Sequence, residues 1–204
     1  MENNILGVIL AGGKSRRMGQ DKNLIKLDDK TLIEHAIIKV NKFFKKTIVV
    51  SNQEMNHISK YNLEIIPDCI TGHQGPLVGI LSAMMWAKKY NNNYSWLMSF
   101  PCDTPFFPEE IIKKFIQLSK ENKSKLYFAG SKGKRHNIFG LWSLDLYDNL
   151  NNDILNSNVR KVDLWAEKNN VKKIDFDFKN FDPFLNINTK DDLKKAIEIN
   201  KKLK

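Results

Sequence analysis

A glycine-rich loop directly follows an apolar segment at 5–10 and is the first candidate for chemistry in this chain. It combines glycines with cations over a short stretch, namely Gly12, Gly13, Gly19, Lys14, Arg16, Arg17 and Lys22. Glycines let the backbone turn and bring its N–H groups close to an anion, while the cations supply positive charge within reach. A polyphosphate site requires this combination, so the loop predicts binding of a nucleoside triphosphate.

The loop differs from two common phosphate-binding motifs. Gly13-Lys14-Ser15 resembles the end of a Walker A sequence, but the first glycine of that motif would fall at Val8, inside the expected first strand. The glycine spacing also departs from the G-x-G-x-x-G fingerprint of dinucleotide-binding proteins. The segment is therefore a phosphate loop of another kind, or a glycine-rich surface loop whose cations are solvated.

Polar residues also follow three other expected strands, namely Asn52 after 47–50, Asp68 after 63–66 and Asp103 after 96–100. In open α/β sheets, ligands bind beyond the carboxyl ends of the strands, so these residues are candidates for one cleft. Asn52 and Asp68 could hydrogen-bond a base or ribose, or could instead close turns at the strand ends.

Asp103 is the predicted metal ligand. It lies in the segment 101–105, where a proline on each side stiffens the loop. Magnesium takes one or two carboxylates together with phosphate oxygens and water, so a single Asp suffices when a triphosphate supplies the rest. The alternative is an Asp that caps a turn before the helix expected at Pro108.

The histidines suggest no catalytic or metal site. No Ser/His/Asp set is evident, and the four histidines lack zinc-like spacing. His35 falls inside an expected helix and is predicted to be structural. His136 falls in a basic segment at 134–137, taken as a loop that either meets a second anionic substrate or lies in solvent. The segment 75–79 either presents helix N–H groups to a ligand or simply begins a closely packed helix.

Apolar runs alternate with helical patterns, which predicts an α/β fold with a mainly parallel sheet and helices on both faces. Strands are expected at 6–10, 47–50, 63–66, 96–100, 126–129, 139–143 and 171–174. Helices are expected after the capping box of Thr31 and Glu34, after Pro76, from Pro108, over 144–155 and 159–167, and after the capping pair Thr189 and Asp192. Turns are expected at 91–93 and 149–152, and an exposed loop at 132–134.

The composition is that of a soluble globular protein, with 42% hydrophobic and 27% charged residues among 204. We expect one domain over residues 1–204. Two cysteines, Cys69 and Cys102, are too few for a disulfide framework, and neither a signal peptide nor a membrane span is evident, so cytoplasm is expected. The net charge of +10 allows a nucleic-acid binder, but the lysines are spread over helix faces rather than interleaved with aromatic residues.

Taken in order, these residues resemble the molybdenum cofactor guanylyltransferases, within the nucleotidyltransferases of Rossmann-like fold. The resemblance spans nearly the whole chain. It rests on the loop at 10–19 with Asp21 and Lys22, on Asn52 and Asp68, and on the segments 75–80, 101–105, 160–162 and 186–189. It implies a three-layer fold whose N-terminal part binds the nucleotide and whose C-terminal part, with the segment 186–188, binds the acceptor.

The resemblance also implies roles for individual residues. Leu10, Ala11, Gly12 and Gly13 would bind GTP, Lys22 and Arg17 its phosphates, Asn52 and Asp68 the nucleotide pocket, and Asp103 both Mg²⁺ and the nucleotide. The terminal phosphate of molybdenum-molybdopterin would attack the α-phosphorus of GTP and expel pyrophosphate. That phosphate is already ionised near neutral pH, so positioning and charge neutralisation replace a general base.

The partners implied are GTP, the molybdenum-molybdopterin acceptor, and transient contacts with cofactor biosynthesis proteins and recipient molybdoenzymes. A monomer is expected, with neither nucleic acid nor membrane as a partner. The alternatives are a related enzyme that uses CTP or a sugar-phosphate acceptor, and a non-catalytic nucleotide-binding module. A nucleic-acid binder would instead show strongly salt-dependent affinity without nucleotide turnover.

Overall fold

A seven-stranded sheet forms the centre of the computed structural model, which describes residues 1–12, 24–72, 75–90, 93–179 and 181–203. The strand order is β5-β4-β1-β6-β8-β7-β9. β8 runs antiparallel to its neighbours β6 and β7, and the other strand pairs of this sheet are parallel. The strands are β1 (Ile5–Leu10), β4 (Thr47–Val50), β5 (Glu64–Ile66), β6 (Trp96–Pro101), β7 (Leu126–Ser131), β8 (Lys134–Ser143) and β9 (Lys172–Asp175).

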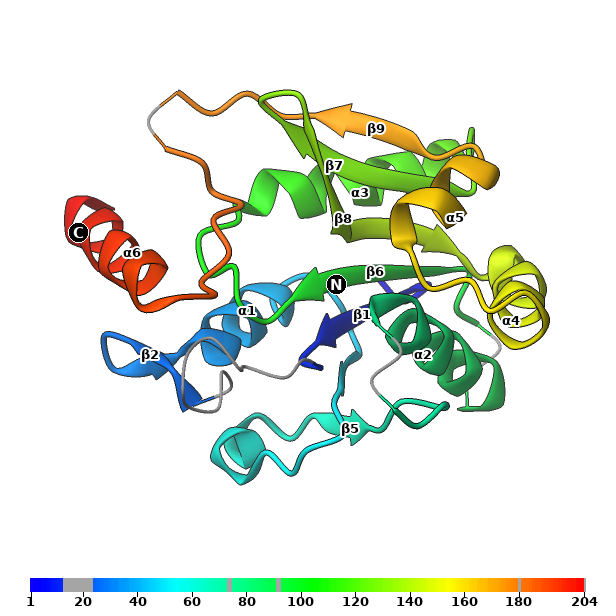
Figure 1. Ribbon diagram of the computed structural model, residues 1–204, viewed down its shortest axis with the longest axis horizontal. Helices are drawn as coiled ribbons and strands as arrows, with labels where there is room; N and C mark the ends of the chain where they lie inside the picture. Colours follow the sequence, from blue (N-terminus) through cyan, green and yellow to red (C-terminus); the bar gives the residue numbers. More distant parts are fainter. Residues whose placement is uncertain (13–23, 73–74, 91–92, 180, 204) are drawn as a thin grey trace.

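Helices cover both faces of the sheet, which gives a three-layer α/β architecture (Figure 1). α1 and α3 pack on one face, and α2, α4 and α5 pack on the other. The helices are α1 (Leu32–Val40), α2 (Pro76–Tyr90), α3 (Glu109–Glu121), α4 (Tyr147–Asn156), α5 (Val162–Lys168) and α6 (Lys190–Leu203). The predicted α/β class and mainly parallel sheet are thus confirmed.

Alternation along β1 explains why the sheet needs a helical layer on each side. Ile5 and Ile9 belong to the core beneath α1 and α3, whereas Leu6 and Val8 belong to the core beneath α2. Successive side chains of a strand point to opposite faces, so a strand that is apolar at every position must be buried on both. The near-continuous apolar run in the sequence follows from this double burial.

Two capping boxes fix the ends of helices that the sequence predicted. The backbone N–H of Thr31 donates to Glu34 Oε2 at 2.7 Å at the start of α1. At the start of α6, the N–H of Asp192 donates to Thr189 Oγ1 at 3.1 Å and the N–H of Thr189 donates to Asp192 Oδ2 at 2.9 Å. These bonds satisfy N–H groups that the first turn of a helix leaves unpaired.

Several expected boundaries in the second half of the chain were wrong. The expected helix at 144–155 begins with a short 3₁₀ turn, η3 (Leu144–Leu146), before α4, and the one at 159–167 begins at Val162. The expected turn at 149–152 lies inside α4, where its asparagines continue the helix. The expected turn at 91–93 falls mostly outside the described residues.

The expected loop at 132–134 is the turn of a β-hairpin. Lys132 and Gly133 both have positive φ, 48° and 77°, which is the geometry of a tight two-residue hairpin turn, so β7 and β8 continue pairing up to it. The segment 134–137 is therefore strand rather than loop.

A smaller hairpin and the last helix form a separate cluster beside the sheet. β2 (Lys26–Leu27) and β3 (Lys30–Thr31) pair antiparallel, and α6 packs against this hairpin through Ala196, with Ile187 of the preceding segment in the same apolar cluster (Figure 1). This packing places Ile187, just before α6, against Ile25, Leu27 and Leu32 near the start of the chain.

Candidate functional site

The carboxyl ends of β1, β4, β5 and β6 lie side by side at one edge of the sheet (Figure 1). Backbone hydrogen bonds continue the ladder past the strand ends. The N–H of Ala11 donates to Val50 O at 2.9 Å, that of Ser51 to Ile66 O at 2.9 Å, and that of Cys102 to Leu10 O at 3.2 Å. The residues that follow these strands are consequently held at the same edge, as predicted for a ligand site at the ends of parallel strands.

Gly12 is the last described residue of the glycine-rich loop, and it is exposed. A Cβ built on it would meet no described atom within 4 Å. Leu10 and Ala11 just before it are fixed by the strand ladder, so the backbone leaves the sheet in a defined direction. Gly13, Arg17 and Lys22 lie outside the described residues, and their roles stay predictions.

Asn52 and Asp68 are joined by two hydrogen bonds. Asn52 Nδ2 donates to Asp68 Oδ2 at 2.7 Å, and the backbone N–H of Asp68 donates to Asn52 Oδ1 at 2.9 Å. This pairing joins the segments that follow β4 and β5. It agrees with the alternative role of both residues, which is to close turns at the strand ends. Their predicted contact with a nucleotide stays a prediction, and the pairing would hold the Asp68 carboxylate in one orientation for it.

Gly79 lets α2 approach these strand ends closely. A Cβ at Gly79 would lie 3.1 Å from Leu10 Cδ2 and 3.7 Å from Asp68 Oδ1. Contacts of about 3.1 Å between carbon atoms are tighter than van der Waals packing favours, so a side chain here would push α2 away. The close-packing interpretation of this glycine therefore has direct geometric support.

Asp103 lies in the loop that follows β6, and the segment before α6 packs onto it. The N–H of Ile187 donates to the backbone oxygen of Asp103 at 2.9 Å. Thr104, which is fully buried, donates its hydroxyl to Asn186 Oδ1 at 2.6 Å and lies 3.3 Å from Asp103 Oδ1. Asp103 and Asn186, 83 positions apart in sequence, thus lie in one neighbourhood.

Thr104 is not recognisable as a site residue from the sequence alone. A threonine before a proline in a loop commonly serves only the local backbone, and its partner is distant in the chain. The only sequence signal was its place in the segment 101–105, beside the predicted metal ligand. Asn188 also has a local role, because its N–H donates to Asp192 Oδ2 at 3.1 Å at the start of α6.

The donor set around Asp103 suits magnesium bound together with a phosphate. Within the described ranges, no three His, Cys, Asp or Glu side chains gather into a metal-binding group. A cage made wholly of protein ligands is therefore absent from that part of the chain. A lone carboxylate at a strand end matches the way Mg²⁺ is held when substrate phosphates and water supply most ligands.

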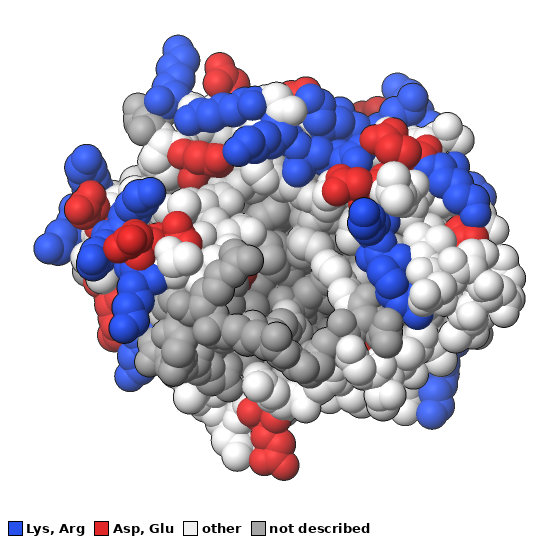
Figure 2. Space-filling model, viewed as in Figure 1, with Lys and Arg blue, Asp and Glu red and all other residues white. Residues whose placement is uncertain are grey.

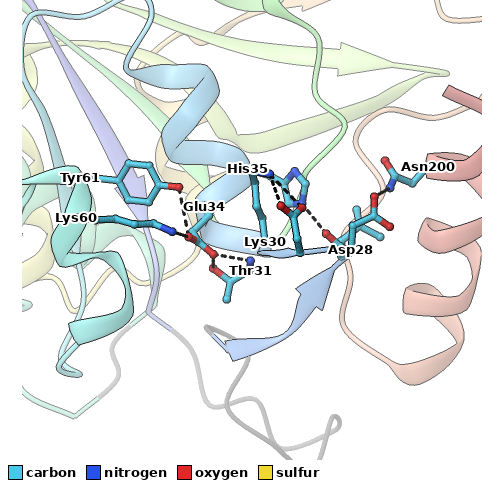
Figure 3. Close-up of polar contacts among 10 residues, drawn as sticks. Asp28, Lys30, Thr31, Glu34, His35, Lys60, Tyr61 and Asn200 are labelled. Atoms are coloured by element: carbon cyan, nitrogen blue, oxygen red, sulfur yellow. Dashed lines mark hydrogen bonds and ion pairs between the residues drawn. The ribbon is translucent and has the colours of Figure 1, made fainter. Parts of the chain in front are cut away.

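A buried carboxylate supports the connection between β4 and β5 (Figure 3). Glu34 on α1 accepts from Thr31 and contacts Lys60 Nζ at 2.7 Å, and Tyr61 donates its hydroxyl to Glu34 Oε1 at 3.3 Å. Lys60 and Tyr61 end the 3₁₀ helix η2 (Asn56–Tyr61). Burial alone would raise the pKa of Glu34, but the bonds from Lys60 and Thr31 outweigh it and lower the pKa to about 2.

Figure 3 also shows polar contacts that hold the small hairpin. Asn200 on α6 donates to Asp28 Oδ2 at 2.6 Å. His35 Nε2 lies 3.0 Å from the carbonyl oxygen of Leu27. The contact of His35 with this hairpin agrees with the structural role predicted for it.

His136 does not lie in a solvent-exposed loop, and its contact with a second anionic substrate stays a prediction. It lies on β8, where its ring stacks on Phe184 with centroids 3.8 Å apart, and Nε2 lies 2.8 Å from Ser131 Oγ. Burial lowers the pKa of His136, with Asp182 opposing and Lys134 adding to the shift, so the ring is neutral near pH 7. A neutral, stacked ring is poorly suited to bind an anion.

The side chain of Arg135, next to His136 in the sequence, is engaged in ion pairs. Its guanidinium bonds to Asp163 Oδ1 at 2.9 Å and Glu167 Oε1 at 2.5 Å, both on α5. On the face in Figure 2, Lys and Arg are interspersed with Asp and Glu, with blue side chains prominent along the upper edge. The described residues include no helix of the length and apolarity that crossing a membrane requires.

Comparison with known proteins places this arrangement in a family. The profile of the MobA-like NTP transferase domain matches residues 7–168, which include the strand ends described above. The chain belongs to this family. As a MobA-like NTP transferase it is an enzyme of the nucleotidyltransferase class.

Individual relatives cover nearly the whole chain. Proteins named molybdenum cofactor guanylyltransferase from Nitrobacter hamburgensis and Haemophilus influenzae are 30% and 32% identical to it. The first alignment covers 93% of this chain and 91% of that protein, and the second covers 95% and 97%. The crystal structure of molybdopterin-guanine dinucleotide biosynthesis protein A from Archaeoglobus fulgidus is similar with a TM-score of 0.75 and 26% identity, covering 97% of this chain and 99% of that one.

The MobA-like fold is shared with more distant proteins. A 4-diphosphocytidyl-2C-methyl-D-erythritol synthase from Anaerococcus prevotii has a TM-score of 0.73 at 15% identity, covering 97% of this chain and 96% of that one. At that identity the likeness concerns the fold alone. Because one fold can carry different functions, individual residues must determine which substrates react.

Proposed function

We propose that this enzyme transfers GMP from GTP to the terminal phosphate of molybdenum-molybdopterin, which releases pyrophosphate and forms molybdopterin guanine dinucleotide. The observation that carries the proposal is the convergence of Gly12, Asn52, Asp68 and Asp103 at one edge of the parallel strands. The names of the curated relatives, which cover more than nine-tenths of the chain, support the substrate assignment.

The nucleotide lies, in this proposal, over the ends of β1, β4 and β5. The backbone at 10–13 approaches the phosphates, because glycine leaves room for an anion next to N–H groups. Lys22 and Arg17 neutralise phosphate charge. The Asn52–Asp68 pair offers an amide and a carboxylate to the nucleoside, already oriented by the two hydrogen bonds between them.

Asp103 is the residue that would hold Mg²⁺. When bound, Mg²⁺ supplies charge neutralisation for the phosphate oxygens on which negative charge develops. The chain itself holds the backbone of Asp103 through the N–H of Ile187, and Thr104 Oγ1 lies beside the carboxylate. The chain must also hold the acceptor phosphate in line with the α-phosphorus. No side chain has to act as a general base in this step, because the acceptor phosphate is already ionised.

The C-terminal part of the chain provides the acceptor side. Asn186 reaches the Asp103 loop through Thr104, so a pterin bound near 186–188 would have its phosphate close to the nucleotide site. Asparagine side chains offer both donors and acceptors, which suits a heterocyclic ring. Residues 1–204 act as one domain in this proposal, as a cytoplasmic monomer that meets cofactor biosynthesis proteins and recipient molybdoenzymes transiently.

The first test is calorimetric titration of the purified protein with GTP, CTP, ATP and UTP, each with and without Mg²⁺ and at two salt concentrations. Selective, Mg²⁺-dependent binding of GTP is expected and leads to a turnover assay with the pterin acceptor. A preference for CTP would move the assignment to a cytidylyl transfer. Binding of GTP without turnover would indicate a non-catalytic module, and failure to bind any nucleotide would overturn the proposal.

A further inference from the structure

The ammonium group of Lys39 reaches from α1 to the loop that follows β6. Its Nζ donates to the carbonyl oxygen of Pro105 at 3.1 Å and to that of Phe107 at 2.5 Å. The same nitrogen lies 4.4 Å from the centroid of the Phe107 ring. One side chain of α1 thus makes three contacts with a segment more than 60 positions away in sequence.

This loop is short of its own hydrogen-bond donors. Prolines at 101, 105 and 108 have no backbone N–H, so they cannot donate to neighbouring carbonyl groups. A carbonyl group that is removed from water and left without a donor destabilises the structure. Lys39 supplies donors to two carbonyl oxygens within a stretch of three residues.

The loop is also anchored by packing and by the two neighbouring segments. Phe107 is fully buried, with its ring centroid 5.4 Å from that of Phe100 and 5.3 Å from that of Phe139. On the amino-terminal side Cys102 bonds to Leu10, and Ile187 bonds to the oxygen of Asp103. Lys39 fixes the carboxyl-terminal side, so Asp103 lies between anchors on both sides.

We propose that Lys39 is a positioning residue for the Asp103 carboxylate, acting through the carbonyl groups of Pro105 and Phe107. Without these bonds the carboxyl-terminal half of the loop loses its polar anchor, and the direction of the Asp103 side chain becomes less defined. The inference rests on the proposed function insofar as Asp103 holds the metal there. Displacements of about 1 Å in catalytic groups can reduce rates by one to two orders of magnitude.

The electrostatic surroundings indicate that the charge of Lys39 has a specific use. Burial lowers its pKa to about 8, Glu109 and Glu110 on α3 oppose the shift, and Lys42 adds to it. A partly buried ammonium group costs free energy that an apolar side chain of similar length would avoid. Keeping a lysine at this position is understandable if the donated hydrogen bonds hold the loop.

The test compares Lys39→Met, Lys39→Arg and the matched control Lys42→Met. Methionine keeps an unbranched stem of similar length and removes the donors, whereas arginine keeps a charge and donors. Lys42 lies three positions along the chain, is exposed, and bonds to Glu109 at 2.9 Å. For each variant we would measure kcat, KM for GTP, the Mg²⁺ concentration at half-maximal rate, and amide hydrogen exchange over 100–107, with thermal unfolding as a check of folding.

For Lys39→Met we expect kcat to fall by about tenfold and the half-saturating Mg²⁺ concentration to rise several-fold, with KM for GTP nearly unchanged at saturating Mg²⁺. Exchange over 100–107 should accelerate, because local opening becomes easier. Lys39→Arg should recover part of both effects, and Lys42→Met should match the wild-type protein.

Two outcomes separate this inference from the proposed function. If the wild-type enzyme transfers GMP and Lys39→Met shows normal kcat, Mg²⁺ dependence and loop exchange, the role of Lys39 is refuted while the function stands. If the wild-type enzyme transfers no GMP, the function fails, and loop exchange alone decides whether Lys39 anchors this segment. Should Lys39→Met not fold, the comparison of Lys39→Arg with Lys42→Met decides. Wild-type values of kcat, Mg²⁺ dependence and loop exchange in Lys39→Arg support anchoring through donated hydrogen bonds. Unchanged loop exchange together with lost activity in Lys39→Arg contradicts it.

Discussion

The two halves of the sheet place polar residues differently at the edge where the parallel strands end. On the β5-β4-β1-β6 side, parallel strands end and loops begin, so Gly12, Asn52, Asp68 and Asp103 follow the strands. On the β8-β7-β9 side, a hairpin continues the ladder as far as Lys132 and Gly133. Beyond the first residue after β1, β4 and β6 the chain leaves the ladder, whereas the backbone groups of a hairpin stay paired up to its turn.

Two basic residues of the hairpin side form ion pairs, Arg135 with helix α5 and Lys173 with Asp175 of the same strand. Arg135 bonds to Asp163 and Glu167, and His136 stacks on Phe184. The polar residues of the parallel side pair along the edge of the sheet, as Asn52 and Asp68 do. Polar composition alone therefore does not mark a site, because the topology decides which polar side chains follow strand ends and which lie on a paired hairpin.

The largest expected effect is that of Asp103→Asn, which removes the charge of the proposed metal ligand with little change in shape. Mg²⁺-dependent transfer should fall by about 100-fold or more, because a charge that stabilises the reacting phosphates is lost. The matched control on the other half is Asp175→Asn at the end of β9, which pairs with Lys173. Steady-state rates at saturating Mg²⁺ would measure both, and equal activity of the two variants would remove Asp103 from the chemistry.

Lys22→Ala should raise KM for GTP by more than about tenfold, because a charge-assisted contact to phosphate would be lost. The control is Lys134→Ala on the hairpin side, at the start of β8. Nucleotide titrations at two salt concentrations would separate a specific contact from a general loss of positive charge. Equal effects of the two substitutions would contradict the assignment of phosphate binding to the glycine-rich loop.

Glu34→Gln should destabilise the parallel half in a pH-dependent way. The pKa of Glu34 is lowered from 4.5 to about 2, so its contribution is fully present above pH 4.5 and is lost as the pH falls toward 2. At neutral pH the variant should lose on the order of 2 kcal/mol in free energy of unfolding, and less at lower pH.

Urea unfolding from pH 7 down to pH 3 would measure this effect, with the exposed Glu54→Gln as a control. A difference between wild type and Glu34→Gln that stays constant with pH would show that the charge of Glu34 does not stabilise the fold.

The smallest expected effect comes from two similar hydrogen bonds, one in each half. Asn52 Nδ2 donates to Asp68 at 2.7 Å, and Asn137 Nδ2 donates to Asp163 at 2.6 Å. Both bonds are exposed, so Asn52→Ala and Asn137→Ala should each cost about 1 kcal/mol of stability or less. Asn52→Ala alone should also raise KM for GTP several-fold, and a similar rise in Asn137→Ala would end the distinction between the halves.

Local sequence patterns were sufficient for much of the fold. The apolar runs placed strands such as β1 and β6, because strands buried on both faces must be apolar throughout. The capping boxes at Thr31 and Thr189 marked helix starts, because a cap is decided within four residues. The predicted common edge for Asn52, Asp68 and Asp103 followed from the geometry of parallel strands.

The secondary-structure predictions were wrong where one sequence pattern is compatible with two local structures. Asparagines at 149–152 are typical of turns, yet burial of Leu150 and Ile154 against the sheet makes the segment helical. The basic segment at 134–137 looked like a loop because its charges obscure the strand pattern. Pairing with β7 and the bonds to α5 decide its structure, and neither can be derived from the segment itself.

The α/β class, the order of the main elements and the residues that follow the parallel strands can all be read from local patterns in the amino-acid sequence. These depend on periodicity, caps and breakers, which act over a few residues. The tertiary structure alone decided that Thr104 meets Asn186, that Lys39 reaches Pro105 and Phe107, and that His136 lies against Phe184. Such contacts join segments from about 50 to more than 80 positions apart, and they depend on how helices and loops pack on the finished sheet, which no local pattern encodes.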